Sequence, residues 1–363
     1  MILYDFSSLL VRSVFTATKN VNPHKKDGKY VTDDYIAVAI FRIINELIDS
    51  YKTYHSEYGE MILCMDDSTK QYWRKEFYPP YKSQRKKERD ESEINWNEVY
   101  KHIDVLSKVL DQYSPFKSFS TKGAEADDII FVLTKRHAMF EKVLILSPDK
   151  DFKQLQRLGQ VKQYSALTNE WIQMGNESLT EWKNEHIILG DVCDGVPKIV
   201  DNLKFSENFK TYLHSKNLDI NEEQYDKLGY QNQQKLLEDY NIFKYNKKGE
   251  PTTLDIFETV RFGKTNILKM IKEYGTIENW LDSNPLLRSN YERNKILVLD
   301  ETIPQEIEIQ IMKDYNNGKT EFHLDKLEKY FMNYNLRTCV ELFRDLAHSS
   351  LPKVELTIDN CGW

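Results

Sequence analysis

The stretch KGAEADDIIFVLTKRHAMFEKVLILSPDKD, residues 122–151, places acidic residues at two points separated by an apolar helix and an apolar strand. The five carboxylates are Glu125, Asp127, Asp128, Asp149 and Asp151. Apolar residues recur at helical spacing after the first acidic group, at Ala126, Ile129, Ile130 and Leu133. This spacing predicts a helix that begins at the acidic residues and buries one face.

The second acidic group follows a run that is typical of a buried strand. Residues 143–146 are continuously apolar and end at Ser147-Pro148, so Asp149 and Asp151 come just past the strand end. Ligands of open α/β sheets bind outside the carboxyl ends of the strands. An alternative is that these residues only cap a helix and form a turn. Taken alone, this stretch leaves both interpretations open.

The same pattern occurs at two more places in the chain. Residues 1–4 form an apolar strand-like run that ends at Asp5, and residues 61–65 form another that ends at Asp66. Parallel strands bring such ends to one edge of a sheet. We therefore predict a doubly wound, mostly parallel α/β sheet with an acidic site at that edge and a helical carboxyl-terminal portion.

A basic and aromatic segment follows Asp66. Residues 70–89 hold eight Lys or Arg residues and two Glu residues, interleaved with aromatic side chains and broken by Pro79-Pro80. Basic groups bind phosphates and aromatic rings stack on unpaired bases, so the segment suits single-stranded nucleic acid. The alternative is a solvated surface helix. Its place directly after Asp66 favours the nucleic-acid interpretation.

Later segments give weaker signals. Asp191 and Asp194 are three residues apart and could share a cation, whereas residues 201–253 are polar and indicate no chemistry. Residues 253–260 and 267–274 have helical spacing on either side of the triplet 263–265, which predicts a helix-turn-helix. A phosphate-loop motif is rejected because it needs a glycine at position 258, which is Glu258. An ordinary helical hairpin is the alternative.

Composition limits the class of protein. The net charge is −7, which argues against a protein that simply coats phosphates, and the four cysteines form no Cys-x-x-Cys pair. Cysteines in this pattern fit a reducing compartment. No apolar run reaches membrane-spanning length. We expect a soluble protein of the cytoplasm.

The acidic residues themselves indicate a cofactor. Nine carboxylates are candidates to converge, and like charges so close need cations to neutralise them. All candidate ligands are oxygens, which favours Mg²⁺, or Mn²⁺ in its place, over Zn²⁺. Two ions about 4 Å apart could activate water against a phosphodiester. Lys82 and Arg85 could then steady the phosphate charge.

These motifs, in this order, resemble the 5′-nuclease family. The resemblance rests on Asp5, Asp66, Tyr81-Lys82 with Arg85, Glu125-Ala126-Asp127-Asp128, Asp149-Lys150-Asp151, Gly190-Asp191 with Asp194, and Phe262-Gly263-Lys264-Thr265. The phage RNase H branch of the T-even type is most similar, over about residues 1–320. It implies a PIN-like core and magnesium-dependent cleavage from 5′ ends, with flap endonuclease activity for primer removal on the lagging strand.

The resemblance also implies residue roles. Asp5, Asp66, Glu125, Asp127 or Asp128, and Asp149 resemble the first metal cluster, and Asp151, Asp191 and Asp194 resemble the second. Lys82 and Arg85 match the catalytic positions of a helical arch. The nucleic-acid contacts would be Tyr72, Arg74, Tyr81, Lys86, Lys87, Gly263, Lys264 and Thr265. Two features depart from the family pattern. One is the sequence Asp194-Gly195-Val196-Pro197 after the last ligand, and the other is the stretch of about 60 residues that separates it from the duplex-binding hairpin.

We expect four segments from this interpretation. They are a nuclease core at 1–200 with an arch at about 70–92, a polar insertion at 201–253, a helical DNA-binding region at 254–346 and a tail at 347–363. The carboxyl-terminal region could bind a single-stranded-DNA-binding protein or a sliding clamp. Alternatives are a non-catalytic replisome adaptor that binds DNA, or another magnesium-dependent phosphoryl-transfer enzyme.

Overall fold

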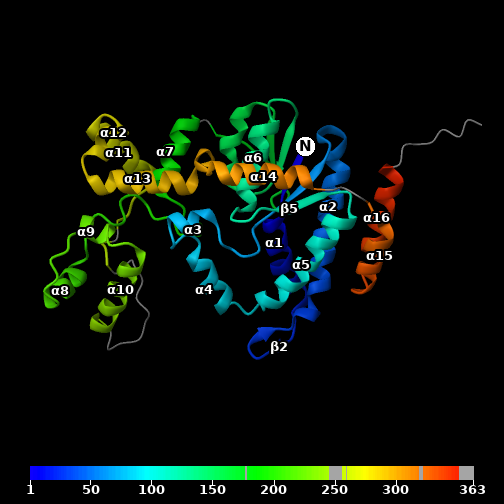
Figure 1. The fold of residues 1–363 in the computed structure, drawn as a ribbon, viewed down its shortest axis with the longest axis horizontal. Coiled ribbons are helices and arrows are strands. Elements are labelled where there is room, and N and C mark those ends of the chain that lie inside the picture. The colour runs from blue at the N-terminus through cyan, green and yellow to red at the C-terminus, as the bar shows by residue number, and fades with distance from the viewer. Residues whose placement is uncertain (176–177, 245–255, 259, 319–321, 351–363) are drawn as a thin grey trace, which may run out of the picture. The chain divides into compact units, whose positions relative to one another are not determined.

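The computed structural model describes the chain except residues 176–177, 245–255, 259, 319–321 and 351–363, and the side chains of 86–87, 241–244 and 349–350 (Figure 1). The chain forms two compact units. Unit 1 comprises Met1–Tyr72, Glu88–Gln173 and the chain from Gln305 on, and unit 2 comprises Trp73–Lys87 and Met174–Pro304. The units are interleaved along the sequence, whereas the four expected segments are consecutive.

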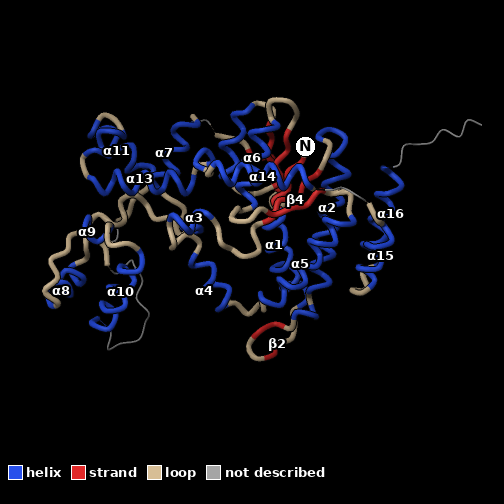
Figure 2. Tube along the Cα trace, viewed as in Figure 1, coloured by secondary structure: helices blue, strands red, loops and turns tan. Residues whose placement is uncertain are grey.

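Unit 1 is built on a six-stranded sheet in the order β5-β4-β1-β6-β7-β8. Figure 2 draws its strands in red. The strands are β1 (Ile2–Asp5), β4 (Met61–Met65), β5 (Lys117–Ser120), β6 (Val143–Leu146), β7 (Val161–Ser165) and β8 (Glu170–Ile172). All neighbours are parallel except β7 and β8, which are antiparallel. The predicted mostly parallel sheet is confirmed. The edge strands β5 and β8 were not predicted, because they are short and carry few apolar residues.

Helices cover both faces of this sheet. Side chains alternate between the faces of a strand, and Ile2 and Tyr4 of β1 pack in one core with α1 (Phe6–Val21) and α2 (Ile36–Tyr58). The opposite face contacts α6 (Ala126–His137), in which the predicted apolar positions are buried. The helix buries more than the one face expected, because every residue from Asp128 to Thr134 is buried. Buried strands with helices on both sides explain the continuous apolar runs in the sequence.

The remaining elements of unit 1 flank the two helix layers. They are the hairpin β2 (Lys25–Lys26) and β3 (Lys29–Tyr30), η1 (Thr32–Asp34), α5 (Trp96–Tyr113), η2 (Lys150–Leu158), α14 (Gln305–Asn317), α15 (Leu324–Met332) and α16 (Arg337–Ser350). The helices α15 and α16 are separate because the chain turns at Asn335, whose φ is +56°. The two helices pack on each other, and α16 also packs on α2.

Unit 2 is helical. It contains α3 (Trp73–Phe77), the first part of α4 (Ser83–Glu91), α7 (Leu179–Leu189), η3 (Val192–Asp194), α8 (Glu207–Ser215), α9 (Glu222–Asp226), α10 (Tyr230–Lys244), α11 (Lys264–Tyr274), α12 (Ile277–Asp282), α13 (Pro285–Val298) and η5 (Asp300–Thr302). The polar stretch 201–253 has a core of its own. Phe205, Phe209, Tyr212, Tyr225 and Tyr240 pack together inside it, so these helices are held by aromatic contacts.

The predicted helix-turn-helix is not formed as expected. Its second helix, predicted over residues 267–274, is α11, which ends before Gly275 as predicted but begins three residues earlier, at Lys264. The prediction of its first helix is wrong for residues 256–258, which are not helical. Residues 253–255 and 259 lie outside the described chain. Phe257 instead bridges antiparallel to Phe205, and Glu258 N donates to Lys204 O at 2.9 Å. This pairing gives hydrogen-bond partners to backbone groups that would otherwise be paired within a helix.

No helix among the described residues is both long and apolar enough to cross a membrane.

Candidate metal and nucleic-acid site

Three neighbouring strands of unit 1 end at or shortly before an acidic residue. The sheet places β1 between β4 and β6, with Asp5 opposite Cys64 and Tyr4 opposite Leu146. Asp5 therefore lies between the ends that lead to Asp66 and to Asp149. These ends are far apart in sequence, and the parallel pairing brings them to one edge.

Asp5 is buried and held from two sides. Its side chain is 7% exposed and accepts hydrogen bonds from Ser8 N at 3.0 Å and from the Ser147 hydroxyl at 2.8 Å. The first bond caps α1, as a helix N-terminus favours. The second joins the end of β1 to the loop after β6. Asp5 is thus both a cap and a carboxylate fixed at the sheet edge.

Asp66 connects β4 to the start of α6. One carboxylate oxygen accepts from Ala126 N at 3.0 Å, and the other lies 3.2 Å from the Tyr72 hydroxyl and 3.4 Å from the Lys70 ammonium. The backbone of Lys70 has a φ of +56°, a conformation that costs energy in a residue with a side chain. The acidic residues that begin α6 are therefore beside the ends of the strands.

Glu125, Asp127 and Asp128 have different surroundings. Glu125 and Asp128 form a capping box, in which Glu125 N donates to an Asp128 oxygen at 3.0 Å, and both side chains are buried. The alternative role of a helix cap therefore applies to Asp128. Asp127, on the first turn, is half-buried. Of this pair, Asp127 remains the better candidate for a ligand.

The loop after β6 orders Asp149 and Asp151 locally. Asp149 N donates to the Ser147 hydroxyl oxygen at 3.2 Å, and Asp151 N donates to an Asp149 oxygen at 2.9 Å. Since Ser147 also donates to Asp5, one hydroxyl joins two strand ends. This arrangement holds Asp5 and Asp149 at neighbouring points of the edge.

The charges of this edge act on groups beneath it. Burial raises the pKa of the Cys64 thiol, and the negative charges of Asp5 and Asp127 raise it further.

Within the described residues of unit 1, no three of the carboxylates at this sheet edge bring oxygens within 4.8 Å of one another. Every donor at this edge is an oxygen, the ligand type that Mg²⁺ and Mn²⁺ take. The donor set therefore fits a hard divalent cation that would draw the carboxylates together.

Asp67 was not selected from the sequence as a site residue, yet it fixes this edge. It is 5% exposed and accepts from Gly123 N at 2.8 Å and from Thr69 N at 3.0 Å. Its own N donates to Ala124 O at 3.0 Å. Burial opposes ionisation of Asp67, but hydrogen bonds from Gly123 and Thr69 outweigh this effect and lower the pKa of the carboxyl. The acidic doublet after a strand was the signal that could have identified it.

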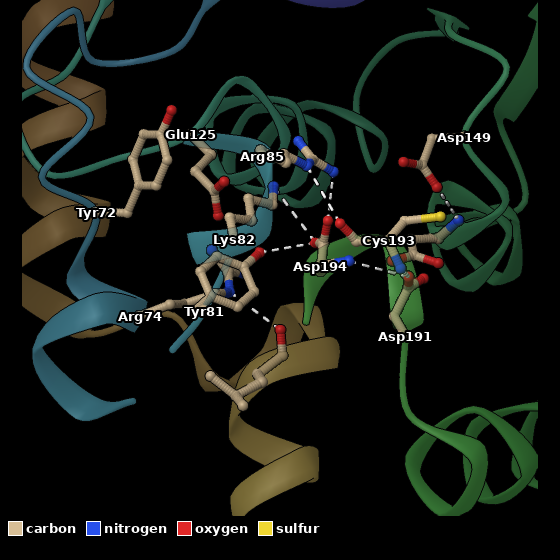
Figure 3. A network of polar contacts seen from close by, with 12 residues as sticks. Tyr72, Arg74, Tyr81, Lys82, Arg85, Glu125, Asp149, Asp191, Cys193 and Asp194 are labelled. Carbon is tan, nitrogen blue, oxygen red and sulfur yellow. Dashed lines mark hydrogen bonds and ion pairs between the residues drawn. The ribbon is translucent and has the colours of Figure 1, made fainter. Parts of the chain in front are cut away.

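In unit 2 the arch residues gather around Asp194 (Figure 3). The Tyr81 hydroxyl donates to Asp194 at 2.9 Å, the Lys82 ammonium lies 3.3 Å away, and the Arg85 guanidinium pairs with the other carboxylate oxygen. Lys82 N also donates to Asp194 O at 2.8 Å. The backbone of Lys82 has a φ of +54°, a strained conformation that these contacts hold in place.

Asp191 and Asp194 lie on one closed loop of unit 2. Asp191 caps η3 by accepting from Cys193 N at 2.8 Å and Asp194 N at 3.3 Å, and its backbone bridges to Val196. Asn294, which the sequence did not indicate, donates to Ile187 O at 2.9 Å and Pro197 O at 2.7 Å. A buried amide on α13 thus ties the two ends of this loop together.

The remaining predicted nucleic-acid contacts have mixed positions. We expected Tyr72, Arg74 and Tyr81 to face nucleic acid, but all three are buried, and Arg74 donates to Leu297 O at 3.1 Å. Lys264 pairs with Glu185 at 2.6 Å, and Gly263 N donates to Asn266 at 3.1 Å. Thr265 lies in the first turn of α11. The side chains of Lys86 and Lys87 lie outside the described part of the chain.

Comparison with known proteins adds a family to this geometry. Residues 1–184 match the family described as 5′-3′ exonuclease, N-terminal resolvase-like domain. This chain belongs to that family. The matched residues include every candidate ligand of the sheet edge, from Asp5 to Asp151. The family therefore agrees with the resemblance that the sequence motifs indicate.

Two known proteins resemble this exonuclease-family chain. Ribonuclease H of Enterobacteria phage T4 is 33% identical over 143 residues, which are 39% of this chain and 47% of the phage protein. The match thus spans about half the length of that relative. The T5 D15 protein, crystallised with metal ions, superposes with a TM-score of 0.50 at 15% identity, covering 86% of this chain and 97% of that protein. The second likeness shows a shared fold.

Proposed function

We propose that this exonuclease-family chain is a divalent-metal-dependent 5′ to 3′ nuclease. It hydrolyses phosphodiesters at the 5′ ends and flaps of DNA and RNA/DNA duplexes, and it removes RNA primers during lagging-strand replication in the cytoplasm. One observation carries the proposal. Asp5, Asp66 and Asp149 follow three adjacent parallel strands, and Asp66 is bonded to the start of α6.

The residues that would hold the first metal ion come from this edge. Asp5, Asp66, Glu125, Asp127 and Asp149 are the ligands that we propose for the first ion, which we take to be Mg²⁺. We propose Asp151, Asp191 and Asp194 as ligands of a second ion. When bound, such ions would activate water and neutralise charge on the phosphate under attack. The metal ions named for the T5 protein support a metal requirement here.

Lys82 and Arg85 would act on the phosphate. Both carry fixed positive charge on the arch, where they are paired with Asp194. A phosphate entering the site offers oxygens that can replace the carboxylate as their partner. In this role the two side chains neutralise charge that develops during hydrolysis. Their pairing with Asp194 keeps them positioned before the substrate arrives.

The substrate class follows from the family and the relatives. Ribonuclease H is the printed name of the T4 relative, which supports RNA in a hybrid duplex as a substrate. The basic arch suits the single strand of a flap, and the start of α11 offers backbone N–H groups to a duplex phosphate. A single-stranded-DNA-binding protein or a sliding clamp remains a proposed partner of the carboxyl-terminal region, whose residues 351–363 lie outside the described chain.

A cleavage assay with defined substrates tests the proposal. A 5′-labelled DNA flap and an RNA primer on DNA are incubated with the protein in Mg²⁺, in Mn²⁺ and in EDTA. We expect short 5′ products only with a divalent ion. Uncut substrate at all Mg²⁺ and Mn²⁺ concentrations, with tight binding in a gel shift, would favour the non-catalytic adaptor instead.

Asp149→Asn supplies the matching variant. We expect it to lower cleavage at least about a hundredfold, because it removes one charge where the metal must bind, while flap binding in Ca²⁺ is retained. Asp325→Asn, an exposed carboxylate on α15, is the control and should cut at the parental rate. Equal rates for Asp149→Asn and the parent would contradict the ligand assignment.

A further inference from the structure

We infer that Gln163 is a positioning residue of the metal site. It stands on β7, is 1% exposed, and its amide nitrogen donates to Ser147 O at 3.0 Å and Asp149 O at 2.6 Å. The inference rests on the proposed function, because Asp149 is one of its proposed ligands. Gln163 itself would touch neither metal nor substrate. It would act through the loop that carries Asp149.

The end of the β6–β7 ladder explains why this loop needs a side chain. The paired residues end at Leu146 and Tyr164, after which Ser147 N still donates to Tyr164 O at 3.2 Å. The carbonyls of Ser147 and Asp149 lie beyond the ladder. Buried backbone carbonyls need partners, and both N–H groups of Gln163 supply them. The side chain thus extends the pairing past the last strand residue.

The orientation of the amide is fixed by its partners. Carbonyl oxygens only accept hydrogen bonds, so the nitrogen of Gln163 must face Ser147 and Asp149. Its oxygen accepts from the Gln156 side chain at 3.2 Å, and Gln156 also donates to Ile172 O at 3.1 Å. A buried amide is tolerated when its hydrogen bonds are made and is strongly unfavourable when they are not. The side chain is therefore held in one place.

Two proposed metal ligands, Asp149 and Asp5, depend on the position of the loop that Gln163 holds. Ser147, whose carbonyl it holds, donates its hydroxyl to Asp5 at 2.8 Å and accepts from Asp149 N at 3.2 Å. Gln163 therefore bears on Asp149 directly and on Asp5 through Ser147. Groups that orient metal ligands typically change metal affinity tenfold to a hundredfold when they are removed. The spacing of two carboxylates at adjacent strand ends would be set in this way.

Gln163→Leu tests the inference, because leucine fills similar volume and donates no hydrogen bond. Binding of Mn²⁺ to the full chain is measured by electron paramagnetic resonance without nucleic acid. We expect a loss of affinity of about tenfold or more. In cleavage, the Mg²⁺ concentration for half-maximal rate should rise more than the maximal rate falls. Lys162→Ala, the exposed neighbour on β7, is the control and should bind Mn²⁺ as the parent does.

Ser147→Ala is the second variant, in case Gln163→Leu does not fold. It removes only the hydroxyl between Asp5 and Asp149, and near-ultraviolet circular dichroism without metal checks its packing. We expect weaker Mn²⁺ binding here as well, and a double variant that is less than additive. Parental Mn²⁺ affinity in the folded variants would overturn the inference. A parent that neither binds Mn²⁺ nor cuts would overturn the proposed function itself.

Discussion

The ammonium group of Lys82 lies 3.3 Å from a carboxylate oxygen of Asp194, and the Lys82 side chain is only 8% exposed. Burial opposes ionisation of Asp194, but the charges of Lys82 and Arg85 outweigh it and lower the pKa of that carboxyl. The Asp194 carboxylate therefore stays charged in ordinary buffers. A buried charge whose partner is removed is left uncompensated. The arch and the acidic loop of unit 2 are thus electrostatically joined.

Replacing Lys82 tests its proposed role at the phosphate. We expect Lys82→Ala to lower turnover by about two orders of magnitude, because a charge positioned for the transition state is lost. Circular dichroism should show a folded protein, since Arg85 still pairs with Asp194. Lys101→Ala, an exposed lysine on α5, is the matched control. A variant that cuts as fast as the parent would exclude Lys82 from catalysis.

Gly190 is predicted to tolerate no side chain. Its φ is +63°, and an added Cβ would lie 2.4 Å from Val196 O and 2.6 Å from Pro197 O. Gly190→Ala should therefore displace the loop that carries Asp191 and Asp194, lowering both activity and the unfolding temperature. Gly28→Ala shares the positive φ but has open space around it, so it isolates backbone strain of about 1–2 kcal/mol. Equal unfolding temperatures for the two variants would argue against a steric role.

Asp67 is predicted to stabilise unit 1 at the metal edge. Asp67→Ala leaves Gly123 N without its acceptor inside the protein, which should cost about 1–3 kcal/mol of unfolding free energy. Urea unfolding measures this, with Ser68→Ala, an exposed neighbour, as the control. Asp67→Asn should cost less, because its amide oxygen still accepts one bond. A loss that is no larger for Asp67→Ala than for Ser68→Ala would contradict this role.

The contacts of the hairpin β2–β3 with Glu93 should make the stability of the protein depend on pH. Hydrogen bonds from Lys25 and Tyr30 lower the pKa of Glu93. When the pKa is lower in the folded state, the ionised group stabilises the protein at any pH above the unfolded-state pKa of about 4.3. This contribution is lost as the pH falls through the folded-state pKa. We expect the parent to unfold at a higher temperature than Glu93→Gln at pH 6. The difference should shrink toward pH 3. A constant difference would contradict the assignment.

Metal binding should also raise the unfolding temperature of the protein. A cation that binds only the folded chain raises the unfolding temperature by mass action. We expect Mg²⁺ to raise it in the parent relative to EDTA, and Asp149→Asn to reduce the effect. Differential scanning calorimetry over a Mg²⁺ series measures both. Identical shifts in the two proteins would place the stabilising ion away from Asp149.

The elements of the core were predictable because their signals are local. Apolar runs gave β1, β4 and β6, and helical spacing after Glu125 gave α6. An acidic residue that follows each of three strands predicts an acidic edge, since parallel strand ends must meet. The first helix of the expected helix-turn-helix failed, because residues 256–258 pair with a distant segment. The aromatic core within 201–253 was missed because its rings are spread thinly among polar residues.

The sequence by itself determined the strands β1, β4 and β6, the helix that begins at the acidic residues, and which carboxylates stand at strand ends. Only the tertiary structure decided that β1 lies between β4 and β6, that Gln163 holds the Asp149 loop, and that Tyr81, Lys82 and Arg85 meet at Asp194. Local patterns report which face of an element is buried. They carry no information on which distant backbone carbonyl or carboxylate will need a partner, because that depends on how the chain packs.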